Sequence, residues 1–420
     1  MTIQGVADIL TAEPDQPAQT TTQTTTLART RAILADLIAF PTESARSNLA
    51  IVDYIEAYLA REGITARRIP NADGSKASLL ATIGPEGQPG VALSAHTDVV
   101  PVAGQDWSSD PWTLTEREGR LYGRGTSDMK GFLAVVLAHV PLFKQAATHT
   151  PVHLCFSYDE ELGCLGAPDL VAEVAALPVP PALCIVGEPT ALKVARAHKG
   201  KFARRLTITG RGGHSALLHR AANAVEAGAE ITVGLGVLGR SLRGETNEAF
   251  DPPWTSVHVG SLHGGTALNL VPDHATLEFE ARTLPGTDLD SLNARIALII
   301  DEARARLLAQ APEAGIAIAT LSDYPGLDTP EDSGAVRFVA ALAGSNAAPV
   351  TLAFGTEAGL YARAGIPTVV CGPGDIGRAH KADEWIGLDE LAQAGALMVR
   401  LAGRLGTPLA PSDFARPAFA

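Results

Sequence analysis

The sequence predicts an α/β protein with two domains, one of them inserted into the other. Short apolar runs of strand length, at residues 91–95, 152–158 and 182–186, alternate with stretches of helical periodicity. Between about residues 193 and 322 the pattern changes to a βαββαβ order, which is typical of a compact domain of its own. A chain of 420 residues is long enough for both domains.

The outer segments, residues 28–192 and 323–413, should together form one discontinuous domain around a central mixed sheet. Its remaining elements are predicted as helices at 27–40, 48–61, 132–143, 333–342 and 388–405, and strands at 64–69, 79–83 and 368–371. In the insert we expect strands at 206–210, 255–259, 275–281 and 316–321, a turn at 213–215, and helices at 217–238 and 289–308. Residues 1–27 contain a threonine-rich tract without apolar periodicity, so a disordered or loosely attached extension is expected there.

Composition narrows the class of partner. The chain has 33 basic and 46 acidic residues and a formal charge of −13, which argues against nucleic acid or an anionic membrane as the main partner. One basic run, residues 196–205, is interpreted as a solvated segment between the domains.

The four cysteines form no CxxC pair and are expected to be buried free thiols in a reducing compartment. No signal-peptide pattern or apolar run of membrane-spanning length is present, so a cytoplasmic protein is expected.

Acidic residues and histidines follow the ends of several predicted strands. His96 ends one apolar run and Asp98 comes two residues later, a spacing that lets a carboxylate orient a metal-binding imidazole. The other members of the set are Glu160, Glu161 and Glu188 after strands, His380 in the loop beyond a strand, and Asp128 at the start of a helix. Ligands collect outside the carboxyl ends of strands in open α/β sheets, so we expect these side chains to converge.

Such a set suits a pair of divalent metal ions, about 3.5–4 Å apart, that share a carboxylate and activate water. Two imidazoles with three carboxylates and no thiolate fit zinc or a similar borderline ion. One carboxylate must stay off the metals to accept a proton, and the neighbours Glu160 and Glu161 offer that division. A glycosidase fits poorly, because adjacent residues can hardly flank a sugar bond at about 5–9.5 Å. No G-x-S-x-G nucleophile elbow is present.

Eight short strings occur in order over about residues 28–405 and together resemble the M20 family of metal-dependent amidohydrolases. They are SAHTDVVP, GRGTSDMKGF, SYDEELGCLGA, GEPT, GRGGHSA, RTLPG, FGTEAGL and AHKADEW. The resemblance implies a zinc-peptidase-like catalytic domain and an inserted lid or dimerisation domain. It also implies hydrolysis of the N-acyl amide of a small amino acid, with N2-acetyl-L-ornithine preferred.

Site residues follow from the same resemblance. His96, Asp128 and Glu188 would hold one Zn2+, and Asp128, Glu161 and His380 the other, with Co2+ able to substitute. Glu160 would be the general base, Asp98 would orient His96, and the peptide bond after Asp128 would be cis.

Outside the metal set, four residues are candidates. His214 would reach the active site of a second subunit in a homodimer and stabilise an oxyanion, although it could equally be a turn residue. Asn269 resembles a lid asparagine near the substrate. Arg282 could bind a substrate carboxylate or form an exposed ion pair, and Glu357 could pair with a substrate amine.

Two departures from the family pattern concern the substrate groove and the loop of His380. Residues 219–221 replace a segment where relatives more often have proline and glycine, and Ala382 stands where proline is common. Desuccinylation of succinyl-diaminopimelate, deacylation of N-acyl-citrulline, aminoacylase or dipeptidase activity therefore stay open. A non-catalytic metal-dependent binding protein is the alternative of another class.

Overall fold

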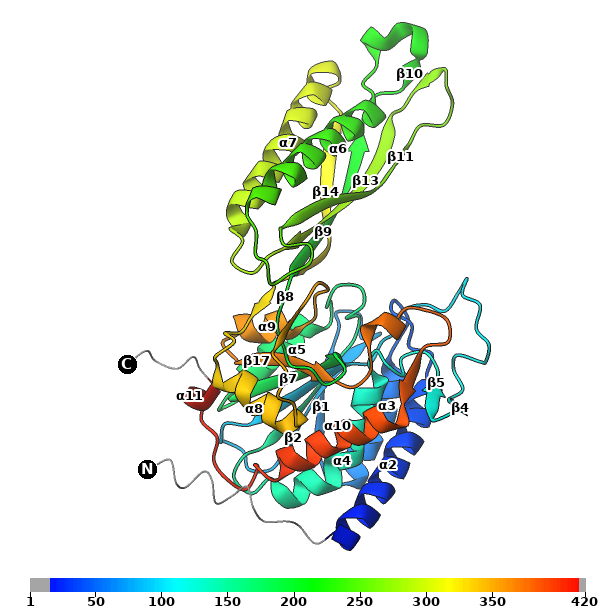
Figure 1. Ribbon diagram of the computed structural model, residues 1–420. Coiled ribbons are helices and arrows are strands. Elements are labelled where there is room, and N and C mark those ends of the chain that lie inside the picture. Colours follow the sequence, from blue (N-terminus) through cyan, green and yellow to red (C-terminus); the bar gives the residue numbers. More distant parts are fainter. Residues whose placement is uncertain (1–15, 415–420) are drawn as a thin grey trace.

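The protein folds as two domains joined by two passages of the chain. The structure is a computed structural model that describes residues 16–414 (Figure 1). The larger domain contains the first and last parts of the chain, and the smaller one is inserted between β8 and β15. Most of the tract expected to be disordered or loosely attached lies outside the described residues, and residues 16–26 have helical backbone. They are the first part of helix α2 (Gln16–Ile38), since extending an existing helix avoids the cost of nucleation.

The larger domain is built on a mixed nine-stranded sheet. Its main path runs β1-β2-β6-β3-β7-β17-β8-β15, and β16 also pairs with β8. The strands are β1 (Ala66–Pro70), β2 (Ala77–Ile83), β3 (Val91–His96), β6 (Val152–Ser157), β7 (Leu183–Pro189), β8 (Ala195–His198), β15 (Leu327–Asp328), β16 (Val350–Leu352) and β17 (Thr368–Gly372). The four central strands β6, β3, β7 and β17 are parallel and fully buried, as expected for a sheet covered on both faces. Their carboxyl ends therefore meet at one edge.

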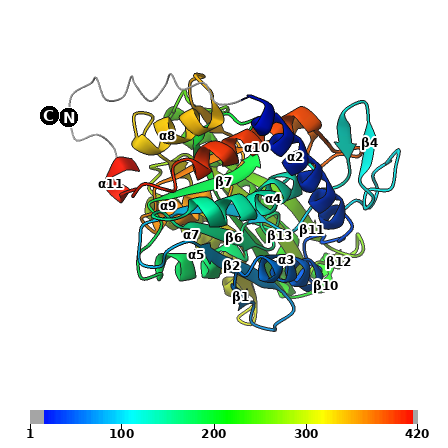
Figure 2. The ribbon, with the colours of Figure 1, turned by 90° about the horizontal axis from the view of Figure 1, so that it is seen from below.

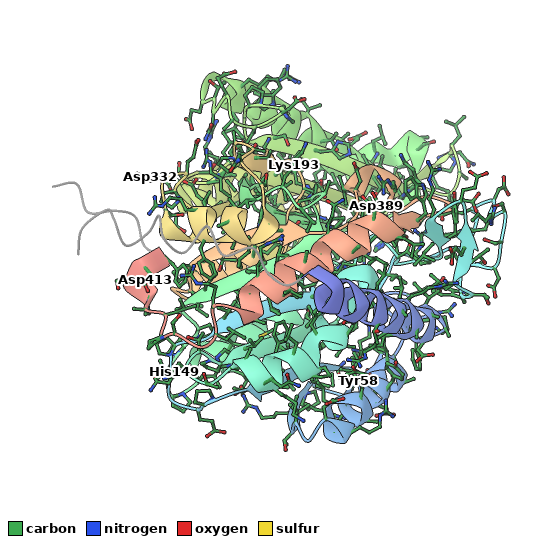
Figure 3. The ribbon with its side chains drawn as sticks, turned by 60° about the horizontal axis from the view of Figure 1, so that its bottom comes forward. Tyr58, His149, Lys193, Asp332, Asp389 and Asp413 are labelled. Atoms are coloured by element: carbon green, nitrogen blue, oxygen red, sulfur yellow. The ribbon has the colours of Figure 1, made fainter. Side chains whose placement is uncertain are left out.

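Helices cover the two faces of this sheet. One face packs against α2, α3 (Leu49–Arg61), α4 (Lys130–Ala146), α8 (Gly334–Ala343) and α10 (Leu388–Ala402). Figure 2 shows α2, α4 and α10 together on this side, and they contact one another. The hydroxyl of Tyr58 (Figure 3) ties α3 to α4 by donating to the carbonyl of Leu137 at 2.9 Å. The other face packs against α5 (Ala167–Ala175) and α9 (Ala358–Arg363). All four cysteines are buried and free, as expected.

The inserted domain has the predicted βαββαβ order. Its antiparallel sheet runs β11-β13-β9-β14, with β9 (Gly200–Thr209), β11 (Ser256–Gly264), β13 (His274–Thr283) and β14 (Gly315–Tyr324). Helices α6 (Ala224–Ser241) and α7 (Leu289–Gln310) bury one face of this sheet (Figure 1). A tip is formed by β10 (Gly213–His214), the 3₁₀ turn η1 (Ser215–Arg220) and β12 (Leu270–Val271).

The helix predicted at 217–238 begins later than expected. Asn223 is the N-cap of α6, and its side-chain oxygen accepts from the backbone N–H groups of Val225 and Glu226 at 3.0 and 3.2 Å. Such a cap defines a helix start more strongly than apolar spacing does. No residue of η1 is buried, so no packing against the core stabilises this segment as a further turn of α6.

A small three-stranded sheet was not predicted. It contains β18 (Trp385–Gly387), β5 (Arg120–Tyr122) and β4 (Thr115–Arg117). The remaining short elements are η2 (Leu242–Gly244), η3 (Ile376–Arg378) and α11 (Pro411–Phe414). Because β18 pairs with β5, the segment that follows His380 lies beside the loop that carries Asp128. Among the described residues, no helix is long and apolar enough to cross a bilayer.

A buried histidine in β8 predicts a pH-dependent stability. His198 donates through Nδ1 to the Lys199 carbonyl at 2.9 Å, its Nε2 has no partner, and burial lowers its pKa from 6.5 to about 4. The unfolded chain therefore binds the proton more readily between these values, so stability falls as the pH drops through this window. Because of His198, the free energy of unfolding of the native chain should fall by roughly 2 kcal/mol between pH 7 and pH 5. The glutamine of His198→Gln cannot be protonated, so this variant should not show that loss. Urea unfolding at both pH values measures this, and equal losses would contradict it.

Candidate metal centre

Three neighbouring parallel strands deliver acidic and imidazole side chains to one edge of the central sheet. His96 is the last residue of β3, Glu188 is the penultimate residue of β7, and Glu160 and Glu161 follow the end of β6. Since β6, β3 and β7 are adjacent and parallel, their carboxyl ends place these side chains together. The predicted convergence at this edge is therefore present.

Asp128 lies between the two histidines. Its Oδ1 is 3.0 Å from Nε2 of His96, and its Oδ2 is 3.3 Å from Nε2 of His380. The carboxylate is buried, and each of its oxygens faces a different imidazole nitrogen. The peptide bond between Asp128 and Met129 is cis, as expected. Two carboxylate oxygens that face different imidazoles are the arrangement that a carboxylate shared by two cations requires.

Each histidine also faces a second carboxylate. Glu188 Oε1 is 3.8 Å from His96 Nε2, and Glu161 Oε2 is 3.0 Å from His380 Nε2. Each histidine is thus close to Asp128 and to one further carboxylate, and the donor atoms of His96, Asp128 and Glu161 also lie within 4.8 Å of one another. Of the two adjacent glutamates, Glu161 is the one that meets His380.

The charges of this cluster suit cations. Burial, and then the charge of Asp128, raises the pKa of Glu188 well above its ordinary value and that of Glu161 to about 7. Hydrogen bonds to Asp128 and Glu161 raise the pKa of His380 to about 10. Like charges that repel each other in a buried site are relieved by a divalent ion between them, and the nitrogen and oxygen donors fit a zinc-like ion. The donor set is therefore compatible with two divalent metals.

Asp98 orients His96 in a way that differs from the expectation. The Nδ1–H of His96 donates to the backbone carbonyl of Asp98 at 2.9 Å, while the Asp98 carboxylate is 3.5 Å from the same nitrogen. That carboxylate accepts from the Ser44 hydroxyl at 2.7 Å and from the backbone N–H groups of Glu160 and Glu161 at 3.1 and 3.3 Å. Asp98 therefore holds the imidazole with Nε2 directed at the cluster, and it also holds the turn that carries both glutamates.

Glu160 stands beside the cluster without pairing with a histidine. Its carboxylate lies in one group with His96 and Glu188, whose donor atoms are all within 4.8 Å of one another. The Cys164 thiol donates to Glu160 Oε1 at 3.3 Å. Burial raises the pKa of Glu160 to about 8. A carboxyl group with a pKa near neutrality can accept a proton and return it, which is what a general base needs.

A buried ion pair that the sequence argument missed supports the turn after β6. Lys76 Nζ is 2.5 Å from both oxygens of Asp159, and Asp159 itself has a φ of +51°. The pair fixes the residue at which the chain leaves the sheet, immediately before Glu160 and Glu161. The SYDEE string contains Asp159, but nothing in the sequence connects it to a lysine 83 residues earlier.

His214 ends β10 at the tip of the inserted domain (Figure 1), and Asn269 directly precedes β12, the strand that pairs with β10. His214 is exposed, its Nδ1 accepts from the backbone of Ala216 at 3.1 Å, and the Asn269 carbonyl accepts from Ser215 at 3.1 Å. Within one chain, this arrangement does not bring His214 to the cluster.

Arg282 lies at the base of the inserted domain. It donates to Glu280 at 3.0 Å and to the Tyr324 hydroxyl at 3.3 Å. The guanidinium therefore takes part in a partly buried ion pair within this chain.

The expected role of Glu357 is not supported and needs correction. The side chain is 1% exposed, and its two oxygens accept from the hydroxyls of Ser94 at 2.5 Å and Ser157 at 2.7 Å. Ser94 and Ser157 belong to β3 and β6, so Glu357 links two strands beneath the cluster. The buried side chain therefore has almost no surface through which a substrate amine could reach it.

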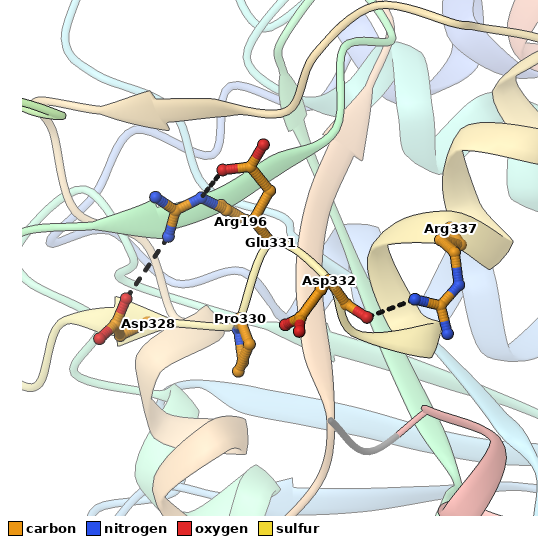
Figure 4. A pocket seen from close by; sticks show the side chains of 6 residues that line it. All are labelled: Arg196, Asp328, Pro330, Glu331, Asp332 and Arg337. Carbon is orange, nitrogen blue, oxygen red and sulfur yellow. Dashed lines mark hydrogen bonds and ion pairs between the residues drawn. The ribbon is translucent and has the colours of Figure 1, made fainter. Parts of the chain in front are cut away.

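A hollow of about 710 Å3 near β8 and β15 is a separate feature (Figure 4). Arg196 makes long ion pairs there with Asp328 at 3.6 Å and Glu331 at 3.8 Å, and Arg337 donates to the Asp332 carbonyl. Both acidic partners of Arg196 are largely exposed. The hollow carries none of the predicted site residues.

Comparisons with known proteins agree with this geometry. Residues 92–404 match the model of peptidase family M20/M25/M40. Acetylornithine deacetylase of Myxococcus xanthus is 35% identical over 381 residues, which cover 89% of this chain and 97% of the relative. Acetylornithine deacetylase of Proteus mirabilis is also 35% identical, over 87% of this chain and 94% of the relative.

Solved structures with the same fold include an M20 family metallo-carboxypeptidase, Sso-CP2, from Sulfolobus solfataricus. It has a TM-score of 0.71 at 17% identity and covers 90% of this chain and 99% of its own. The Bacillus subtilis protein YXEP, described as a dinuclear metal-binding peptidase of the M20 family, has a TM-score of 0.62 at 17% identity and the same coverage. The family match and the identity over most of the chain establish that this protein belongs to the M20 family of metal-dependent hydrolases.

Proposed function

We propose that the protein is a dinuclear zinc amidohydrolase that hydrolyses N2-acetyl-L-ornithine to L-ornithine and acetate, a cytoplasmic step of arginine biosynthesis. The observation that carries the reaction class is Asp128, shared between His96 and His380, with the Glu160 carboxyl group left beside it. The choice of substrate is supported by the two relatives at 35% identity, which are named acetylornithine deacetylases.

His96, Asp128 and Glu188 would hold one zinc ion, and Asp128, Glu161 and His380 the other, with cobalt able to replace zinc. When bound, such ions lower the pKa of water and polarise the acyl carbonyl.

The protein's own groups provide the proton transfer and the orientation. Glu160 accepts a proton from the attacking water and returns it to the leaving amine, which its raised pKa favours. The Cys164 thiol donates to Oε1 of Glu160, and this weak hydrogen bond leaves lone pairs on both oxygens for the proton. The backbone carbonyl of Asp98 keeps the tautomer of His96 with Nε2 free of a proton for the cluster.

The substrate-binding groups include residues of a second subunit. We propose a homodimer formed through the inserted domain, in which His214 and Asn269 of one chain approach the cluster of the other. Four exposed leucines at the tip support this assembly, because exposed apolar patches mark interaction sites. They are Leu217, Leu218, Leu268 and Leu270, exposed by 42%, 61%, 102% and 48%. Arg282 would bind the substrate carboxylate.

Two other functions stay open. Another M20 activity would use the same metal cluster with a different acyl-amino acid, and residues 219–221 of the tip would then shape a different groove. A metal-dependent binding protein without turnover would need no group like Glu160. The raised pKa of Glu160 and its place beside the cluster favour an enzyme.

Metal binding should stabilise the chain through Asp128. Zinc at about 100 times its dissociation constant should raise the free energy of unfolding of the metal-free chain by about 2.7 kcal/mol per site. Asp128→Ala should lose most of this gain, whereas Glu313→Ala, which removes an exposed carboxylate of the inserted domain, should keep it. Thermal unfolding with and without zinc measures both variants. An unchanged zinc response in Asp128→Ala would count against a shared ligand.

Hydrolysis should depend on Glu160 and favour acetylornithine. Glu160→Gln keeps the size of the side chain but cannot accept a proton, so kcat should fall by about 10²- to 10⁴-fold with little change in KM. The assay compares kcat/KM for N2-acetyl-L-ornithine, succinyl-diaminopimelate, N-acetyl-citrulline and a dipeptide. A low rank for acetylornithine would remove the specific substrate and leave the reaction class. Zinc binding without turnover of any amide would favour the binding protein.

Mixed dimers test the contribution of His214. Glu160→Gln and His214→Ala chains should each be nearly inactive alone. After subunit exchange at equal amounts, half of the dimers carry one intact site, so roughly a quarter of the native activity should return. No recovery in a mixture that exchanges subunits, followed by native mass spectrometry, would show that His214 does not act across the interface.

A further inference from the structure

Glu384 is a wholly buried carboxylate that neither meets a histidine of the cluster nor faces a substrate. It lies four residues after His380, in the loop before β18, and is 1% exposed. A charged group is rarely buried unless specific partners surround it. Its partners therefore indicate its role.

All of its partners come from the loop that ends at Asp128. Oε1 of Glu384 accepts from the backbone N–H groups of Ser127 at 2.8 Å and Asp128 at 3.0 Å. Oε2 accepts from the N–H of Gly125 at 3.0 Å and from Nη1 of Arg124 at 2.7 Å. One carboxylate thus accepts hydrogen bonds from three backbone N–H groups of the same loop and from one guanidinium. This arrangement is typical of an anion held in a backbone nest.

The loop has other supports besides Glu384: the Thr126 hydroxyl donates to the Gly123 carbonyl at 2.8 Å, and the Ser127 hydroxyl accepts from the backbone N–H of Asp375 at 3.0 Å. Residues 123–129 lie in turns between β5 and α4, and Gly125 has a φ of +86°. Strand β5, which precedes this loop, pairs with β18, which follows Glu384. At the start of the loop, the N–H of Gly123 donates to the carbonyl of Glu384 at 3.0 Å. Beyond Gly123, the backbone N–H groups of Gly125, Ser127 and Asp128 all donate to the Glu384 side chain.

The short segment of residues 380–384 therefore contacts Asp128 in two places. His380 meets the side chain of Asp128 at 3.3 Å, and Glu384 binds its backbone. We propose that Glu384 is a positioning residue that holds the shared carboxylate of Asp128 at a fixed place relative to His380, so that the two metal ions bind as a pair. This inference rests on the proposed dinuclear function.

The chemistry of the donors makes Glu384→Gln a sharp test. Backbone N–H groups can only donate, and so can the guanidinium. Either orientation of the glutamine amide turns its NH2 group toward two donors, so two of the four hydrogen bonds cannot form.

A purely structural role is the competing explanation, because Arg124 and Glu384 form an ion pair in which both side chains are 1% exposed. Arg124→Met removes this pair but leaves all three backbone N–H groups on the carboxylate. It is therefore the matched control, since it should lower the melting temperature without freeing Asp128.

The experiment titrates Co2+ into the metal-free full-length chain and follows the visible absorption and the bound metal by elemental analysis. The native chain and Arg124→Met should bind two Co2+ ions, whereas Glu384→Gln should lose at least about tenfold in affinity for the second ion. If Glu384→Gln does not fold, Glu384→Asp, whose shorter side chain cannot reach all four donors, is compared in the same way. Native-like uptake of both ions by the folded Glu384 variant would overturn the positioning role. Failure of the native chain to bind two Co2+ ions would instead overturn the proposed function.

Discussion

The contact on which the site depends is the double approach of Asp128 to His96 and His380. One carboxylate with an imidazole nitrogen on each side, at 3.0 and 3.3 Å, joins two halves of a cluster that comes from distant parts of the chain. Around it are buried carboxylates that raise one another's pKa, a state that is costly without a neutralising cation. The geometry and the electrostatics are therefore both compatible with the proposed pair of divalent metal ions.

The residues of the cluster are positioned in two different ways, some by the central sheet and some by loops. Parallel pairing of β6, β3 and β7 brings His96, Glu188 and the Glu160–Glu161 turn to one sheet edge. His380 comes from a loop, and Asp128 from the turn before α4, so neither is held by the central sheet. The small sheet of β18 and β5, together with the Glu384 carboxylate, aligns these two segments. The regular sheet and the irregular loops thus have separate roles in one site.

Much of this organisation could be predicted from the sequence. The mixed α/β class and the βαββαβ order of the insert followed from apolar runs, and the convergence of His96, Glu160, Glu161 and Glu188 followed from their positions after strands. Prediction failed where long-range partners decide. Glu357 is buried because Ser94 and Ser157 bind it, and Glu384 and Asp159 matter because of donors at Arg124 and Lys76, far away in the sequence. Local spacing was also insufficient at 217–223, where the Asn223 cap sets the start of α6.

The most direct test of this account is the anomalous diffraction of crystals grown with zinc. Two peaks should appear about 3.5–4 Å apart, one between His96 and Glu188 and one between His380 and Glu161, with Asp128 bound to both. A single peak, or two peaks that do not share Asp128, would contradict the central claim.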